Sequence, residues 1–94
     1  MPKFIVTHVT NKVPPFTPEF FKQLRPTAEP LLREKYPEVV WNYVFIDNAT
    51  GRAICDWDAP TAEAVEDVLK KLGMPYDAVF PVSKFGAHDM WEQG

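Results

Sequence analysis

Cysteine and serine are almost missing from this sequence, which holds one of each, Cys55 and Ser83. A single cysteine excludes an internal disulfide framework and any metal knuckle that needs a Cys-x-x-Cys pair. With one serine and two histidines, no Ser-His-Asp triad is legible. The four glycines are scattered too widely for a glycine-rich phosphate loop. The sequence therefore offers none of the common motifs for serine catalysis or nucleotide binding.

Positive charge and long apolar runs are also scarce. Thirteen acidic residues against ten basic ones give a net charge of −3, so we do not expect a nucleic-acid partner. No apolar run approaches the roughly 20 residues that span a bilayer, so we expect no membrane partner. Residues 1–10 lack the apolar stretch and cleavage site of a secretory signal, which predicts a cytoplasmic location. The remaining composition, 46% hydrophobic and 24% charged, is typical of one soluble domain.

Proline, in contrast, is abundant, and its ten residues divide the chain into short elements. Thr17 and Pro18 predict the start of a helix that ends before Pro37, and Pro26 and Pro30 either kink it or split it into two. A second helix is predicted from Thr61 to Gly73. The β-branched and aromatic runs predict four strands. These strands cover residues 3–10, 39–47, 52–58 and 78–84.

The predicted element order is βαββαβ, which usually folds as a ferredoxin-like α+β domain. This fold is a four-stranded antiparallel sheet with two helices on one face. The first and third strands are then central. Pro81 cannot donate to a strand ladder, which places the fourth strand at an edge. We therefore predict one domain over residues 1–84, followed by a C-terminal tail over residues 85–94 in which no periodicity is visible.

The hairpin between the second and third strands predicts which residues share a face of the sheet. With the turn near residues 49–50, Trp57 lies opposite Trp41 and Cys55 opposite Tyr43. A carboxylate beneath the helices would be costly, so the face without acids is assigned to the helices. That face carries Trp41, Tyr43, Phe45, Ala53, Cys55 and Trp57. The open face carries Val40, Asn42, Val44, Ile46, Ile54, Asp56 and Asp58.

An open face with apolar residues needs a cover. In a chain of 94 residues the simplest cover is a second copy, which gives a two-fold homodimer with a pocket between the sheets. We expect Asn42, Val44 and Ile54 to line this pocket. The pocket could also hold a small molecule.

Three residues are the main candidates for chemistry. His8 lies in a central strand and is either a satisfied core or interface histidine, or a ligand or general base in the pocket. Asp56 and Asp58 are two residues apart on one strand, so their side chains point the same way. They could share a cation, or they are two solvated acids.

Other polar and aromatic residues carry a weaker signal. Cys55 is interpreted as a buried, unreactive thiol. His88 and Asp89 form a pair of ligand types, but they lie in the tail. For Trp41, Tyr43 and Trp57 we favour a role in the core over a ring-stacking platform.

Residues 39–82 resemble a family of small bacterial ferredoxin-like proteins whose best-described member is a nickel-binding homodimer. The resemblance rests on Trp41 with Asn42-Tyr43-Val44, on Cys55-Asp56-Trp57-Asp58-Ala59-Pro60, on Gly73-Met74-Pro75 and on Val82. The chain departs from the family pattern at Asn42, where serine is usual, and at Asp56, where an aliphatic residue is usual. The resemblance implies a ferredoxin-like dimer and binding of nickel.

Three hypotheses of function follow. The first is a non-enzymatic dimer that binds nickel or another divalent transition metal, with His8, Asp56 and Asp58 as ligands. The second is a dimeric α+β barrel enzyme, such as a cofactor-independent monooxygenase, isomerase or cyclase, that acts on a small apolar or aromatic substrate. In that case His8 or Asp56 is the general acid or base. The third is an interaction module that binds another protein through the open face.

Overall fold

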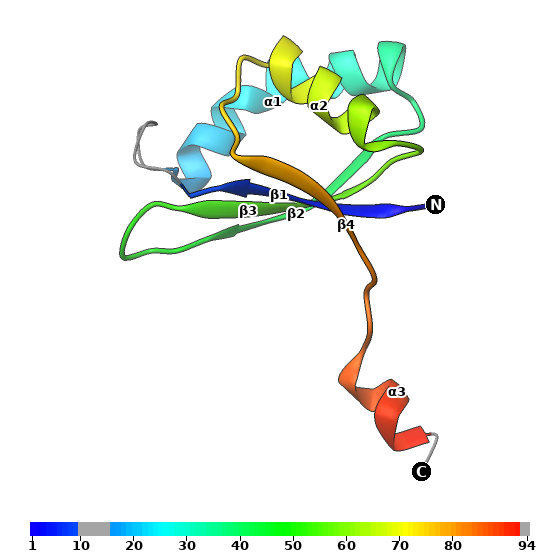
Figure 1. Cartoon of the computed structure of the whole chain (residues 1–94). Helices are drawn as coiled ribbons and strands as arrows, with labels where there is room; N and C mark the ends of the chain where they lie inside the picture. Colours follow the sequence, from blue (N-terminus) through cyan, green and yellow to red (C-terminus); the bar gives the residue numbers. More distant parts are fainter. Residues whose placement is uncertain (10–15, 93–94) are drawn as a thin grey trace.

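Four antiparallel strands form one sheet in the order β2-β3-β1-β4 in the computed structural model, which describes residues 1–9 and 16–92. The two long helices cover one face of this sheet (Figure 1). The predicted α+β architecture, with β1 and β3 central and β4 at an edge, is confirmed. In chain order the elements are β1 (Lys3–His8), α1 (Pro18–Lys35), β2 (Val40–Ile46), β3 (Ala53–Asp58), α2 (Ala62–Lys71), β4 (Ala78–Val82) and α3 (Ala87–Glu92).

The strands are one or two residues shorter at their ends than the sequence predicts. β1 ends at His8, and the last residue of its predicted range, residue 10, lies outside the described residues. None of the helices in the described part of the chain is long and apolar enough to cross a membrane.

The first helix, α1, runs unbroken for 18 residues although Pro26 and Pro30 lie inside it. Of the two alternatives that the sequence left open, the split into two short helices is therefore wrong, and a single helix forms. The Thr17 hydroxyl accepts a hydrogen bond from the backbone N–H of Phe20 at 3.2 Å, which caps the helix as expected. Each internal proline removes one backbone donor, and packing against the core compensates for that loss. Phe21, Leu24, Leu31 and Leu32 supply this packing.

The second helix, α2, begins and ends as the sequence predicts. The Thr61 hydroxyl accepts a hydrogen bond from the backbone N–H of Ala64 at 3.2 Å. At the other end Gly73 has a φ of 66°, a conformation that glycine adopts without strain. The backbone N–H of Met74 then donates to the carbonyl of Leu69 at 3.0 Å, which completes a Schellman cap.

A β-bulge at Asn42 changes the faces of β2. Trp41 pairs with Trp57 as predicted, but the register then shifts, so that Cys55 pairs with Val44 and not with Tyr43. The extra residue turns the remainder of the strand over. Val44 and Ile46 therefore pack against the core. Tyr43 and Phe45, predicted to face the helices, are instead 60% and 56% exposed.

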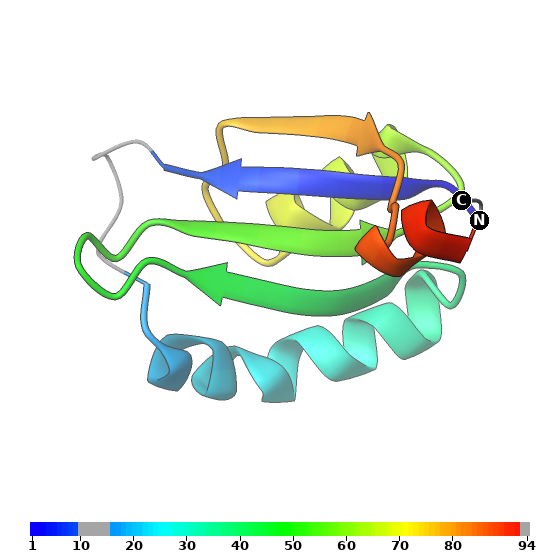
Figure 2. The ribbon, with the colours of Figure 1, turned by 90° about the horizontal axis from the view of Figure 1, so that it is seen from below.

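The core lies between the sheet and the helices, on the face that carries Ala53, Cys55 and Trp57, as predicted for β3. The indoles of Trp41 and Trp57 stack with their centroids 4.7 Å apart and their planes 7° apart. Val65, Val68 and Leu69 of α2 are buried above this sheet face. The opposite face of the sheet, which we call the open face, is covered by neither α1 nor α2, and α3 stands off from the sheet on this side (Figure 1 and Figure 2).

Candidate functional site

A cluster of four polar residues, Lys3, Asn42, Asp56 and Asp58, lies at one end of the open face. We call it the polar cluster. The antiparallel register places Lys3 opposite Asp58, and Asn42 lies on the same side of the sheet at the bulge in β2. The Lys3 Nζ is 2.6 Å from Asp56 Oδ1 and 3.1 Å from Asp58 Oδ1. The Asn42 Nδ2 donates to Asp58 Oδ2 at 2.9 Å and to Asp56 Oδ1 at 3.4 Å.

Mutual stabilisation of charge is the main electrostatic feature of the cluster. The hydrogen bond from Asn42, together with the ammonium of Lys3, lowers the pKa of Asp58. The hydrogen bond to Asp56 raises the pKa of Lys3, although partial burial opposes this rise. Both shifts favour the ionised forms of Lys3 and Asp58 at neutral pH. Two carboxylates and one ammonium leave a local excess of one negative charge.

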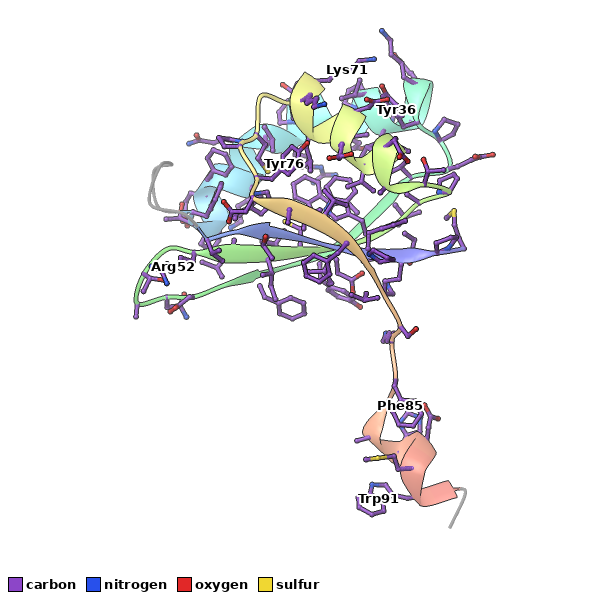
Figure 3. All side chains as sticks on the ribbon, in the orientation of Figure 1. Tyr36, Arg52, Lys71, Tyr76, Phe85 and Trp91 are labelled. Atoms are coloured by element: carbon purple, nitrogen blue, oxygen red, sulfur yellow. The ribbon has the colours of Figure 1, made fainter. Side chains whose placement is uncertain are left out.

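The environment of the cluster is apolar. Ile54 and Phe45 are exposed on the same face, and Phe80 of β4 pairs with Ile5 of β1 on that face. Figure 3 shows that neither α1 nor α2 packs against the side chains below the sheet. Among the predicted pocket residues, Asn42 and Ile54 lie on this face. Val44 does not, because the bulge turns it toward the core.

His8 lies on the opposite face from the two aspartates. It is only 2% exposed, and its Nδ1 is 2.7 Å from the carbonyl oxygen of Pro75. Because a carbonyl cannot donate, Nδ1 carries the proton and Nε2 is free to accept. Nε2 faces the Cys55 Sγ at 3.4 Å. The expectation that His8 shares a face with Asp56 and Asp58 is therefore wrong.

The alternation along β1 explains this placement. Phe4, Val6 and His8 share the buried face, while Lys3 and Ile5 point to the open face. Burial lowers the pKa of His8, and the hydrogen bond to Pro75 opposes this only in part. A neutral, enclosed imidazole cannot reach a substrate or a metal on the open face. His8 therefore matches the alternative of a satisfied core histidine.

Cys55 is fully buried beside His8, and burial raises the pKa of its thiol to about 12. A thiol with such a pKa is protonated at neutral pH, and thiolate is the form that attacks or binds metal. The interpretation of Cys55 as an unreactive core thiol is consistent with this environment. The S–H can donate to the free Nε2 of His8, which satisfies both polar groups.

The second predicted pair of ligand types lies on α3. The His88 Nε2 is 3.4 Å from Asp89 Oδ1, and both side chains are exposed to solvent. In the described residues no group of three or more histidine, cysteine or acidic side chains is placed to hold a metal ion. The polar cluster therefore brings together two carboxylates, those of Asp56 and Asp58, and not three ligand groups.

A hollow lies between α1 and β2, which run side by side at one margin of the sheet (Figure 2). Its volume is about 320 Å³, and Phe21, Trp41 and Tyr43 contribute to its walls. Asn42 joins the wall of this hollow and also the polar cluster. The bulge is thus the point where the two features meet.

Sequence reasoning missed Lys3 and the bulge. Lys3 was recognisable, because the first residue of a central strand lies beside the last residue of its antiparallel neighbour. The bulge had no such signal, since neither glycine nor proline marks residues 41–43.

Fold and site together define a small ferredoxin-like α+β domain with one covered and one open sheet face. The chain belongs to the SCO4226-like family, described as nickel responsive protein SCO4226-like, which matches residues 4–82. This membership confirms the family resemblance seen in the sequence.

One solved structure is similar to this chain, the crystal structure analysis of SCO4226 from Streptomyces coelicolor A3(2). It superposes with a TM-score of 0.70 at 21% sequence identity, over 89% of this chain and 99% of that chain. At this identity the similarity establishes the fold alone. No curated protein matches the chain significantly.

Proposed function

We propose that this protein is a cytoplasmic homodimer that binds nickel or another divalent transition metal at the polar cluster, between two facing sheets. The observation that carries the proposal is the pair of neighbouring carboxylates, Asp56 and Asp58, on an open face that is otherwise largely apolar. The description of the family as nickel responsive supports the choice of metal. No enzymatic step is part of the proposal.

The dimer is supported by the exposed apolar side chains of the open face. Tyr43, Phe45, Ile54 and Phe80 together make this face unlike an ordinary solvated sheet surface. A second copy, related by a two-fold axis, covers the same face on both chains at once. The polar clusters are then enclosed between the two sheets.

The fit of the residues to a metal is incomplete in one chain. Nickel(II) takes nitrogen and oxygen donors, and one cluster offers two carboxylates and one amide. A second copy doubles this supply. Lys3 sits where it competes with a metal ion, because its ammonium already holds both carboxylates. Binding of a divalent ion therefore requires Lys3 to move aside.

The test is a calorimetric titration of the protein with Ni²⁺. Asp56→Asn/Asp58→Asn should abolish binding, whereas Asp67→Asn, on the exposed surface of α2, should leave it unchanged. Lys3→Met removes the competing ammonium and should tighten binding about tenfold or more, given that a charge-assisted hydrogen bond contributes about 1.5–3 kcal/mol. Equal nickel affinity in the wild type and the double variant would refute the site.

The enzymatic alternative and the interaction module gain no specific support from the described residues. Of the two candidate acid–base groups, His8 is enclosed in the core and Asp56 is engaged by Lys3. Nothing on the open face marks a particular protein partner. The metal-binding dimer is therefore the function that we propose.

A further inference from the structure

The chain continues beyond β4 as a segment that we call the C-terminal arm, residues 83–92. It leaves the sheet on the side of the open face and ends in α3, well clear of the rest of the molecule (Figure 1). Seen from that side, α3 stands in front of the end of the sheet where β1 begins (Figure 2). The register confirms this position, because Val82, the last residue of β4, pairs with Lys3. The arm thus starts beside the polar cluster.

The arm carries three large apolar side chains with little cover. Phe85 is 65% exposed, Met90 54% and Trp91 76% (Figure 3). In the described residues, the hydrogen bonds and the ion pair of the arm, apart from the backbone hydrogen bonds within α3, join residues 86–89 to one another. The arm therefore presents an apolar surface that its own domain does not bury.

A helix as short as α3 needs an external surface. Its six residues are far fewer than the roughly 12–15 at which an isolated helix becomes even marginally stable in water. Its start is capped, because Asp89 Oδ2 accepts a hydrogen bond from the backbone N–H of Gly86 at 3.2 Å. The sequence thus encodes a helix whose stability has to come from packing against something else.

The arm is also an addition to the family domain. The family match ends at residue 82, so residues 83–92 lie outside it. A role for the arm therefore has to be argued from this chain alone.

The area of the open face indicates what the arm packs against. Four strands about 4.8 Å apart, with five to seven residues at about 3.3 Å each, give a face of about 400 Å² per copy, or about 800 Å² in a pair. A specific, stable interface buries about 1,200–2,000 Å². The flat outline of two facing sheets lies below this range of accessible area, so contacts from outside the sheets would enlarge the interface. Aromatic residues bury about 150–250 Å² each, so Phe85 and Trp91 of two arms supply such contacts.

We propose that the C-terminal arm of each chain docks against the second copy of the homodimer, with Phe85 and Trp91 as the anchoring residues. This inference rests on the proposed homodimer. The arm projects from the open-face side, away from its own sheet, which is the direction in which a facing copy lies. Each arm then covers its partner next to the enclosed polar clusters, and each exposed aromatic of the arm finds an apolar surface.

The first test measures the dissociation constant of the dimer by sedimentation equilibrium, using the full chain. Phe85→Ser/Trp91→Ser should weaken the dimer about 100-fold or more, because buried tryptophans at interfaces are typical hot spots. Phe20→Ser, an exposed aromatic of α1 on the helix side, is the control and should leave the constant unchanged. A dimer that is equally tight in the arm variant overturns the docking of the arm but not the dimer. A wild-type chain that stays monomeric overturns the proposed dimer itself.

The second test asks which copy the arm touches. Iodide quenching of Trp91 fluorescence, isolated by subtracting the signal of Trp91→Phe, is followed as the protein is diluted through the dissociation constant. Docking on the partner predicts that quenching is weak in the dimer and rises on dilution. Weak quenching at every concentration means that the arm folds onto its own sheet, and strong quenching at every concentration means that it is free. Either of these two results overturns the proposal.

Discussion

The two faces of the sheet satisfy their side chains in different ways. On the helix face, the apolar residues are buried, and the His8 imidazole and the Cys55 thiol are bonded within the core. The buried indole N–H groups of Trp41 and Trp57 have no hydrogen-bond partner among the described residues. On the open face, aromatic residues stay exposed around the ion pairs of the polar cluster. The same four strands thus carry a covered, packed core on one side and an uncovered surface on the other. The helix face provides the packing that stabilises the fold, and the open face carries the proposed metal site.

The largest difference between the two faces should appear in the free energy of unfolding when one aromatic side chain is removed from each face. Trp57→Ala empties the centre of the core and should lower the free energy of unfolding by about 3–5 kcal/mol. Phe45→Ala, on the open face, should change the unfolding of the monomer by about 0.5 kcal/mol or less, and should weaken the dimer instead. Denaturant titration at a protein concentration below the dissociation constant of the dimer measures the free energy of unfolding of the monomer. A large loss of monomer stability in Phe45→Ala would mean that the open face is part of the core.

A smaller effect comes from the protonation of Cys55. Its pKa is raised from 9.0 to about 12, so the folded state favours the protonated thiol. The resulting stability is fully present below pH 9 and is lost at up to about 1.4 kcal/mol per unit as the pH rises toward 12. Cys55→Ala should cost about 1–2 kcal/mol at neutral pH and should show a flatter decline above pH 9. Parallel curves for the two proteins would show that the thiol is accessible to water.

The smallest effect is expected from the protonation of His8, which should change the stability of the fold and not the binding of metal. The pKa of His8 lies below 6.5, so the stability gained from its neutral form is present above pH 6.5 and is lost as the pH falls. His8→Gln should flatten this acid decline and should leave the affinity for Ni²⁺ unchanged, since His8 lies on the helix face. Loss of nickel binding by a folded His8→Gln protein would contradict the separation of the two faces.

The fold was predictable because its signals are local and independent of one another. Thr17 and Thr61 as caps, Gly73 as the helix end and Pro81 as an edge residue each indicated one element boundary or position. The faces of β3 were also predictable, because Asp56 and Asp58 disfavour burial. The short helix α3 was not, since six residues are too few to show a helical period.

The site was only half predictable, and the cause is the bulge. One extra residue at Asn42 inverts Tyr43, Val44, Phe45 and Ile46 relative to simple alternation, and no residue in the sequence marks it. The prediction that His8 lies on the open face was wrong for a different reason. Its face depends on the register between β1 and β3, which the hairpin between β2 and β3 does not constrain.

The most direct test of the account is the native mass spectrum of the full chain with Ni²⁺. The account predicts a dimer of the 10.8 kDa chain that carries nickel, together with a nickel-free dimer for Asp56→Asn/Asp58→Asn. Ile54→Arg, which places a charge in the centre of the open face, should run as a monomer and provides the reference. A wild-type chain that is monomeric at micromolar concentration, or a double variant that binds nickel as the wild type does, would contradict the account.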